Sequence, residues 1–168
     1  MDADVLKAMQ APLKEKYRQS PEAAVLTLKA EGRLGDGLTC SVETGKALVE
    51  AGLHPATGGS GFSACSGDML LQALAACAGV TMGAVATALG LDIRGARIKA
   101  EGDLDFRGTL GVAKDVAVGF RDIRLSFEID ADLSEEQRAT LMKLTERYCV
   151  VYQTLRAPPN ISVLSQAV

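Results

Sequence analysis

The chain has 168 residues, enough for one domain whose hydrophobic core needs no metal or disulfide. Its 18 Lys and Arg residues against 21 Asp and Glu residues give a dispersed net charge of −3. This balance offers no electrostatic basis for binding nucleic acid or an anionic membrane surface. The opening residues MDADVLKAMQ lack the basic and apolar regions of a signal peptide, so we expect a cytoplasmic protein with reduced cysteines.

Residues 2–18 are predicted to form a short amphipathic helix, because their apolar side chains recur on one helix face. We therefore assign residues 1–20 to a helical extension of a single domain that spans residues 1–168. From residue 23 the apolar period changes to two, which is typical of a half-buried strand, and LTCSVE repeats it. The segment LGDG between these two runs predicts a hairpin.

A long uncharged segment, LLQALAACAGVTMGAVATALGL, follows a loop rich in Gly and Ser. The 23 uncharged residues between Asp68 and Asp92 would be about 35 Å long as a helix, enough to cross a bilayer at ~1.5 Å per residue. The segment is mostly Ala, Gly and Thr, however, and has no aromatic or basic anchors at its ends. We therefore expect a buried helix of a soluble protein. Small residues lie on or near one face, at Ala76, Gly79, Gly83 and Ala86. A face of this kind favours close pairing with a second copy in a symmetric dimer.

The C-terminal half alternates again in RGARIKAEGDLDF and twice in VAVGFRDIRLSFEID, where a phase skip near Asp122 predicts a bulge. LSEEQRATLMKLTERYCVVYQTL begins with a capping box at Ser134 and Gln137 and continues as a helical stripe. A break between two helices is possible near Cys149, and NISVLSQ predicts a final short strand. The predicted class is α+β, with one sheet of about six strands covering one side of the central helix.

Four cysteines and one histidine restrict the chemistry. The cysteines form no C-x-x-C pair, a single histidine does not complete a usual zinc set, and no phosphate-binding glycine loop is present. We therefore expect no metal and no nucleotide cofactor. His54, in LHPATGG and without a G-x-S-x-G motif, is expected to be a surface residue rather than a catalytic base.

Taken one at a time, the thiols leave alternatives open. Cys40 lies on the apolar phase of a strand and is expected to be an inert core thiol. Cys65 precedes the expected start of the long helix, where the helix dipole would lower its pKa, or it is an ordinary loop residue. Cys77 on pattern alone is a core thiol, and Cys149 alone is ambiguous. A disulfide between Cys65 and Cys77 is a further, geometrically awkward alternative.

Two motifs together resemble a known family. SGDMLLQALAACAGVTM, followed much later by LTERYCVVYQTL, is similar to the OsmC/Ohr family of osmotically inducible and organic hydroperoxide resistance proteins, over about residues 25–165. The resemblance implies the OsmC-like fold, a strongly curved, mainly antiparallel sheet wrapped around a long buried helix in an intertwined homodimer. It implies a thiol peroxidase in which Cys77 matches the peroxidatic cysteine and Cys149 the resolving one. Arg33, in AEGRLGDG, matches the activating arginine.

The sequence departs from the family pattern at two positions. Peroxidatic members have a glutamate at the start of the central helix, where this chain has Gly67 with Asp68 beside it. Asp68 could substitute, but on a regular helix it lies roughly 180° around from Cys77, and it is also a suitable first-turn acid. The proline that usually follows the second cysteine is replaced by Val150. In these respects the chain resembles the OsmC-like branches more than the core peroxidases.

The predicted activity is reduction of organic hydroperoxides to alcohols through a cysteine sulfenic acid and an intramolecular disulfide, in oxidative stress defence. The resemblance implies a small or protein-bound dithiol, such as a lipoyl group, as reductant. No nucleic acid or membrane partner is expected. The alternative is a non-catalytic protein on the same fold, which binds a small hydrophobic ligand in an apolar cleft or senses redox state.

Overall fold

The computed structural model describes residues 2–5, 8, 10–11, 19, 31–34, 39–43, 48–111 and 113–166, with the backbone alone at 31–34, 39–43 and 48. Of the predicted N-terminal helix, residues 3–5, 8 and 10–11 are helical, residue 2 is not, and the rest lies outside the described residues. The same holds for residues 23–30 of the first predicted strand. The extent of the domain and of its N-terminal extension therefore stays a prediction.

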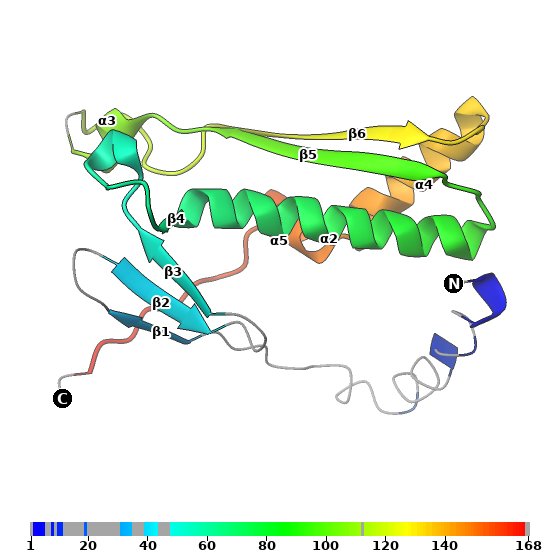
Figure 1. The fold of residues 1–168 in the computed structure, drawn as a ribbon, viewed down its shortest axis with the longest axis horizontal. Coiled ribbons are helices and arrows are strands. Elements are labelled where there is room, and N and C mark those ends of the chain that lie inside the picture. The colour runs from blue at the N-terminus through cyan, green and yellow to red at the C-terminus, as the bar shows by residue number, and fades with distance from the viewer. Residues whose placement is uncertain are drawn as a thin grey trace.

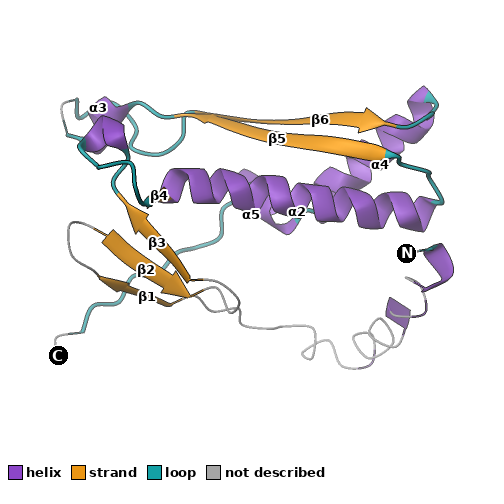
Figure 2. Ribbon diagram, viewed as in Figure 1, coloured by secondary structure: helices purple, strands orange, loops and turns teal. Residues whose placement is uncertain are grey.

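The described strands form two sheets (Figure 2). Antiparallel pairing joins β1 (Glu31–Leu34), β2 (Thr39–Glu43) and β3 (Leu48–Gly52), and the short β4 (Ala64–Cys65) pairs in parallel with β3. A second, antiparallel pair consists of β5 (Gly95–Asp103) and β6 (Asp122–Asp130). The pairing of β1 with β2 agrees with the predicted hairpin. The expected sheet of about six strands is divided, because no pairing joins these two groups of strands in the part of the chain that the structure describes.

That central helix is α2 (Ser66–Leu89), which ends at Gly90 in the left-handed conformation that glycine favours (φ 67°). It packs against β5, α4 (Glu135–Tyr148) and α5 (Val150–Arg156), and β5 and β6 run along its length (Figure 1). By length and composition it could cross a membrane, a property that core helices share. Its packing against a sheet and two helices is that of a core helix. Its buried side chains are Leu74, Ala78, Met82, Val85 and Ala86.

One face of α2 is uncovered in the single chain, and the sequence analysis expects the face away from the sheet to be covered by a second copy. Val80 is 76% exposed on this face, and the exposed residues beside it are Ala73, Ala76, Gly83 and Ala84. The predicted small-residue face is only partly correct. Ala86 is buried, and a Cβ added to Gly79 would lie 3.4 Å from Cδ1 of Ile98 on β5. These two residues therefore face the sheet, because the predicted set straddles the boundary between the covered and uncovered faces.

The β5–β6 hairpin runs in one continuous register from Gly95 opposite Asp130 to Asp103 opposite Asp122, so the predicted bulge near Asp122 is wrong. The segment VAVGF, predicted as a strand, is also irregular. After β5 the chain forms the short helix α3 (Phe106–Thr109), and the following segment folds back onto it. A Cβ on Gly108 would lie 2.5 Å from the carbonyl oxygen of Ala117. The segment that the alternating pattern assigned to a strand therefore packs against α3 instead of joining a sheet.

The helix α4 begins with the predicted capping box. The Ser134 hydroxyl accepts from the Gln137 N–H at 3.1 Å, and the Gln137 side-chain oxygen accepts from the Ser134 N–H at 2.9 Å. Leu141, fully buried on α4, packs with Met82, Val85 and Ala86 of α2 to form the core. The main contact between α2 and α4 is therefore apolar.

Cys149 separates α4 from α5, at the position where the sequence pattern allows a break between two helices. Its extended backbone (φ −73°, ψ 106°) ends one helix and begins the next. The last predicted strand, NISVLSQ, is wrong for the single chain, because the segment is irregular and pairs with no described strand. Its apolar side chains Ile161, Val163 and Leu164 are exposed.

Candidate active site

Two of the predicted thiols meet where α2 passes the α4–α5 junction. Cys77 lies on α2 and is half-buried, whereas Cys149 at the junction is 1% exposed. Both are free thiols, and their sulfur atoms are hydrogen-bonded to each other. The fold thus brings together two cysteines that are far apart in the sequence.

Cys77 has a lowered pKa. Burial alone raises the pKa of this thiol, but hydrogen bonds that favour the thiolate outweigh that effect. The donors are the backbone N–H of Val151, the Cys149 thiol, the Thr81 hydroxyl and the backbone N–H of Val150. The two backbone donors come from the first turn of α5, where N–H groups have no acceptor within the helix. The sulfur of Cys77 is therefore set up to ionise.

Cys149 has the opposite shift. Burial raises the pKa of its thiol, and the hydrogen bond and charge of Cys77 raise it further, while N–H groups of Tyr152 and Val151 oppose this in part. Cys149 therefore stays protonated where Cys77 ionises and can donate its S–H to the thiolate. A pair of groups whose pKa values are driven apart is typical of a reactive site.

Hydrogen bonds around Cys149 fix the junction. Its N–H donates to the Thr145 carbonyl at 3.0 Å, which completes α4, and its carbonyl accepts from the Gln153 N–H at 2.9 Å, which begins α5. The Gln153 side chain then donates back to the carbonyl of Glu146 at 2.7 Å. These bonds tie the first turn of α5 to the last turn of α4 and so hold the first amides of α5 in place.

The other two predicted catalytic residues are not brought to the thiols by any described contact. Arg33 lies within β1, with its backbone opposite Ser41, and its side chain is outside what the structure describes. Asp68 is exposed in the first turn of α2, and α2 is continuous to Cys77, so its carboxylate lies on a different side of the helix. The catalytic roles of Arg33 and Asp68 stay predictions.

Cys65, Cys40 and His54 are the other candidates from the sequence, and none of them has a described contact with the thiol pair. Cys65 is half-buried at the end of β4, directly before α2. It lies about 18 Å of helix from Cys77 at ~1.5 Å per residue, which excludes a disulfide between them in this structure. The side chain of Cys40 is outside the described residues. His54 accepts a hydrogen bond from the Ala56 N–H at 3.0 Å and stacks on Phe106 with ring centroids 5.0 Å apart. This structural role of His54 had no signal in the sequence.

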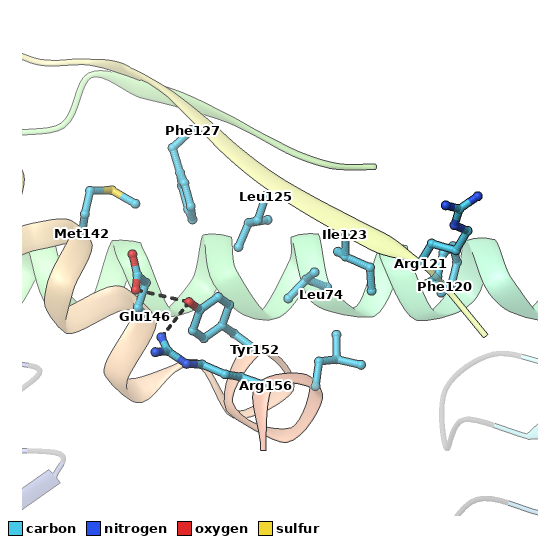
Figure 3. Close-up of a pocket in the computed structure, with 11 residues that line it drawn as sticks. Leu74, Phe120, Arg121, Ile123, Leu125, Phe127, Met142, Glu146, Tyr152 and Arg156 are labelled. Carbon is cyan, nitrogen blue, oxygen red and sulfur yellow. Dashed lines mark hydrogen bonds between the residues drawn. The ribbon is translucent and has the colours of Figure 1, made fainter. Parts of the chain in front are cut away.

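A pocket of about 460 Å³ lies between β6, α2 and the α4–α5 pair (Figure 3). Neither thiol lines it, but Leu74, which precedes Cys77 on α2, does. One wall is polar, because the Tyr152 hydroxyl donates to Glu146 at 3.3 Å and accepts from Arg156 at 3.3 Å. The rest of the lining is mostly apolar and comprises Leu74, Phe120, Ile123, Leu125, Phe127, Met142 and Leu155, with Arg121 near one end.

In the part of the chain that the structure describes, no three His, Cys, Asp or Glu side chains lie close enough together to bind a metal ion. The chemistry available at the site is that of the two thiols and the groups that bond to them.

The fold is a mixed helix and strand fold, in which a central helix brings one thiol beside a second thiol at a helix break. The sequence profile of the OsmC family, described as OsmC-like protein, matches residues 58–164, and the chain belongs to that family. This confirms the predicted family. No protein of curated function matches the sequence.

Solved structures confirm the fold. An OsmC-like protein from Mycoplasma pneumoniae is 20% identical with a TM-score of 0.66, covering 79% of this chain and 89% of its own. An organic hydroperoxide resistance protein from Elizabethkingia anophelis is 14% identical with a TM-score of 0.64, covering 80% and 91%. The organic hydroperoxide resistance protein OhrB of Bacillus subtilis is 20% identical with a TM-score of 0.53, covering 80% and 94%. At these identities the likeness concerns the fold.

Proposed function

We propose that this protein is a thiol peroxidase that reduces organic hydroperoxides to alcohols. The observation that carries the proposal is the hydrogen-bonded pair of free thiols, with the pKa of Cys77 lowered and that of Cys149 raised. Membership of the OsmC family and the likeness of fold to organic hydroperoxide resistance proteins support a peroxidase-like role.

In the proposed reaction the Cys77 thiolate attacks the distal oxygen of R–O–O–H. The O–O bond breaks as the S–O bond forms, the leaving alkoxide takes up a proton to become the alcohol, and Cys77 becomes a sulfenic acid. Cys149 then attacks the oxidised sulfur, the S–S bond forms and water leaves. An external dithiol, for which we propose a lipoyl-type group, reduces this disulfide by exchange and becomes a disulfide itself.

Two further residues belong to the proposal on the strength of the family resemblance. Arg33 is proposed to stabilise the thiolate by its charge, and Asp68 to substitute for the glutamate that orients this arginine in peroxidatic members. Because Asp68 lies in the exposed first turn of α2, we propose that it acts by orienting Arg33 and not by contacting Cys77.

We further propose an intertwined homodimer with curved sheets around paired central helices. The uncovered apolar face of α2, with Val80 at its centre, supports it, because such a face is stabilised by a second copy. Within the described part of the chain β5 and β6 pair only with each other, which leaves two strand edges available. A reducing compartment such as the cytoplasm suits Cys65, Cys77 and Cys149, which are free thiols.

The pocket favours a second candidate function, the binding of a small hydrophobic ligand without catalysis. Its lining is mostly apolar and contains neither cysteine. On this hypothesis a ligand would bind equally well to wild-type protein and to Cys77→Ser.

The test is to trap the two oxidised states. Reduced protein treated with one equivalent of cumene hydroperoxide is expected to give a Cys77–Cys149 disulfide in peptide mass spectra. The Cys149→Ser variant is expected to accumulate a sulfenic acid on Cys77, detected as its dimedone adduct. Cys65→Ser, which alters a thiol outside the pair, is the matched control and should behave as wild type. Recovery of reduced Cys77 under all these conditions would contradict the peroxidase and favour the ligand-binding candidate.

A further inference from the structure

The pocket between β6, α2 and the α4–α5 pair is rich in aromatic side chains for this chain. The sequence has four Phe, three Tyr and no Trp, and three of these rings line the pocket: Phe120, Phe127 and Tyr152. Its volume of about 460 Å³ is that of a small-molecule site. A mostly apolar cavity of this size with a few polar groups at one wall is suited to a ligand that has an apolar part and a polar end.

The rings of Phe127 and Tyr152 are available to such a ligand. Figure 3 shows Phe127 on β6 and Tyr152 on α5, and both line the pocket. Among the described residues the one stacked ring pair is His54 with Phe106, which lies elsewhere, so the two pocket rings do not stack on each other. Ring pairs add to the free energy that burial alone supplies. Rings without a ring partner therefore favour an aromatic ligand over an aliphatic one of the same size.

Arg156 supplies a positive charge at the polar wall. Its Nη1 donates to the Tyr152 hydroxyl at 3.3 Å, and that hydroxyl donates to Glu146 at 3.3 Å, so the hydroxyl lies between the guanidinium and the carboxylate (Figure 3). Within the described part of the chain Arg156 forms no ion pair and no other side-chain hydrogen bond. A guanidinium has five N–H donors in a fork that fits the two oxygens of a carboxylate. The remaining donors of Arg156 are therefore suited to an anionic group on a ligand.

Arg121, the other arginine of the pocket, is less suited to this role, because its Nη1 already lies 3.8 Å from a carboxylate oxygen of Asp105. With two arginines and Glu146 as its charged lining residues, the pocket favours an anion over a cation. We propose that it binds a small aromatic carboxylate, with the ring against Phe127 and Tyr152 and the carboxylate on Arg156. The proposal goes beyond the peroxidase and does not depend on it, because neither thiol lines the pocket.

The experiment is isothermal titration calorimetry of the full-length reduced protein with three ligands of one skeleton. Phenylbutanoate has the ring and the charge, cyclohexylbutanoate lacks the aromatic ring, and phenylbutanamide lacks the charge. We expect phenylbutanoate to bind about twofold or more tightly than the cyclohexyl acid, and about 5- to 30-fold more tightly than the amide.

Three variants locate the two preferences. Arg156→Gln should bind phenylbutanoate no better than the amide, because the partner of the carboxylate is gone. Phe127→Leu should remove the preference for the aromatic ring and keep the preference for the charge. Arg121→Gln is the matched control, because it removes the same charge from the same pocket, and it should keep both preferences.

Absence of saturable phenylbutanoate binding in the millimolar range would overturn the proposal and would fit a pocket filled by a second copy of the chain. Equal affinities for the three ligands, or a charge preference that is lost in Arg121→Gln and kept in Arg156→Gln, would overturn it as well. Arg156 is exposed, so its replacement should leave the fold intact. If Phe127→Leu lowers the helix content in circular dichroism, the wild-type comparison of the phenyl and cyclohexyl acids decides the aromatic part. Binding needs no peroxide and should be unchanged in Cys77→Ser, so its failure and the failure of the peroxidase are separate results.

Discussion

Oxidation of Cys77 and Cys149 to a disulfide should raise the free energy of unfolding by an amount that depends on the number of residues between them. A Cys77–Cys149 disulfide closes a loop of about 70 residues, and the chain-entropy relation gives about 4 kcal/mol for a loop of that size. This is an upper figure, because the buried Cys149 must adjust to bond its partner. At about 2–4 °C per kcal/mol for a chain of this length, the melting temperature should rise by roughly 10 °C.

The assay is differential scanning calorimetry of reduced and peroxide-treated protein at one fixed protein concentration, since self-association would make the melting temperature concentration-dependent. Peroxide-treated Cys149→Ser, which cannot close the loop, should show no rise. An oxidised wild-type protein that melts at or below the reduced form, with the disulfide verified by mass spectrometry, would refute the reasoning. It would mean that the two thiols meet only by distorting the fold.

Three further outcomes are expected. Because Cys77 has a lowered pKa, its ionisation stabilises the reduced protein above the ordinary thiol pKa, and this contribution disappears as pH falls through the lowered pKa. Urea unfolding across that range should lose this pH dependence in Cys77→Ser. Leu141→Ala should cost about 2–5 kcal/mol in urea unfolding, because its fully buried side chain joins α4 to α2; a cost under about 1 kcal/mol would contradict this contact. Asp105 has its pKa lowered to about 2 by hydrogen bonds from Arg107, so Asp105→Asn should reduce the loss of stability as pH falls from about 4 towards 2, and an unchanged acid limb would contradict the pairing.

Local sequence patterns correctly predicted the helices and strands whose signals lie within the element itself. The alternation in LTCSVE and in RLSFEID found β2 and β6, and the spacing of Ser134 and Gln137 found the start of α4. Each of these signals depends on residues within one element. The pairing of Cys77 with Cys149 was predicted only through the family resemblance, because no spacing in the chain relates residues so far apart.

Patterns failed where a distant segment determined the outcome. VAVGF alternates like a strand, but its backbone packs closely against α3 at Gly108, where there is no side chain to prevent the contact. No described strand pairs with it. Gly79 and Ala86 belong to a small-residue face in sequence, but β5 covers that part of α2. The donors at Cys77 were missed for a related reason. Two of the four are backbone amides, whose direction depends on the turn at Cys149 and not on the identity of the side chains.

The most direct test of the central claim is the rate at which purified protein consumes cumene hydroperoxide and hydrogen peroxide with a dithiol reductant. Cys77→Ser and Cys149→Ser are measured beside the wild type. The account predicts rapid turnover of the organic peroxide, slower turnover of hydrogen peroxide, and loss of activity in Cys77→Ser, with Cys149→Ser unable to sustain turnover through the intramolecular disulfide. Consumption of cumene hydroperoxide no faster than that of Cys77→Ser would contradict the account.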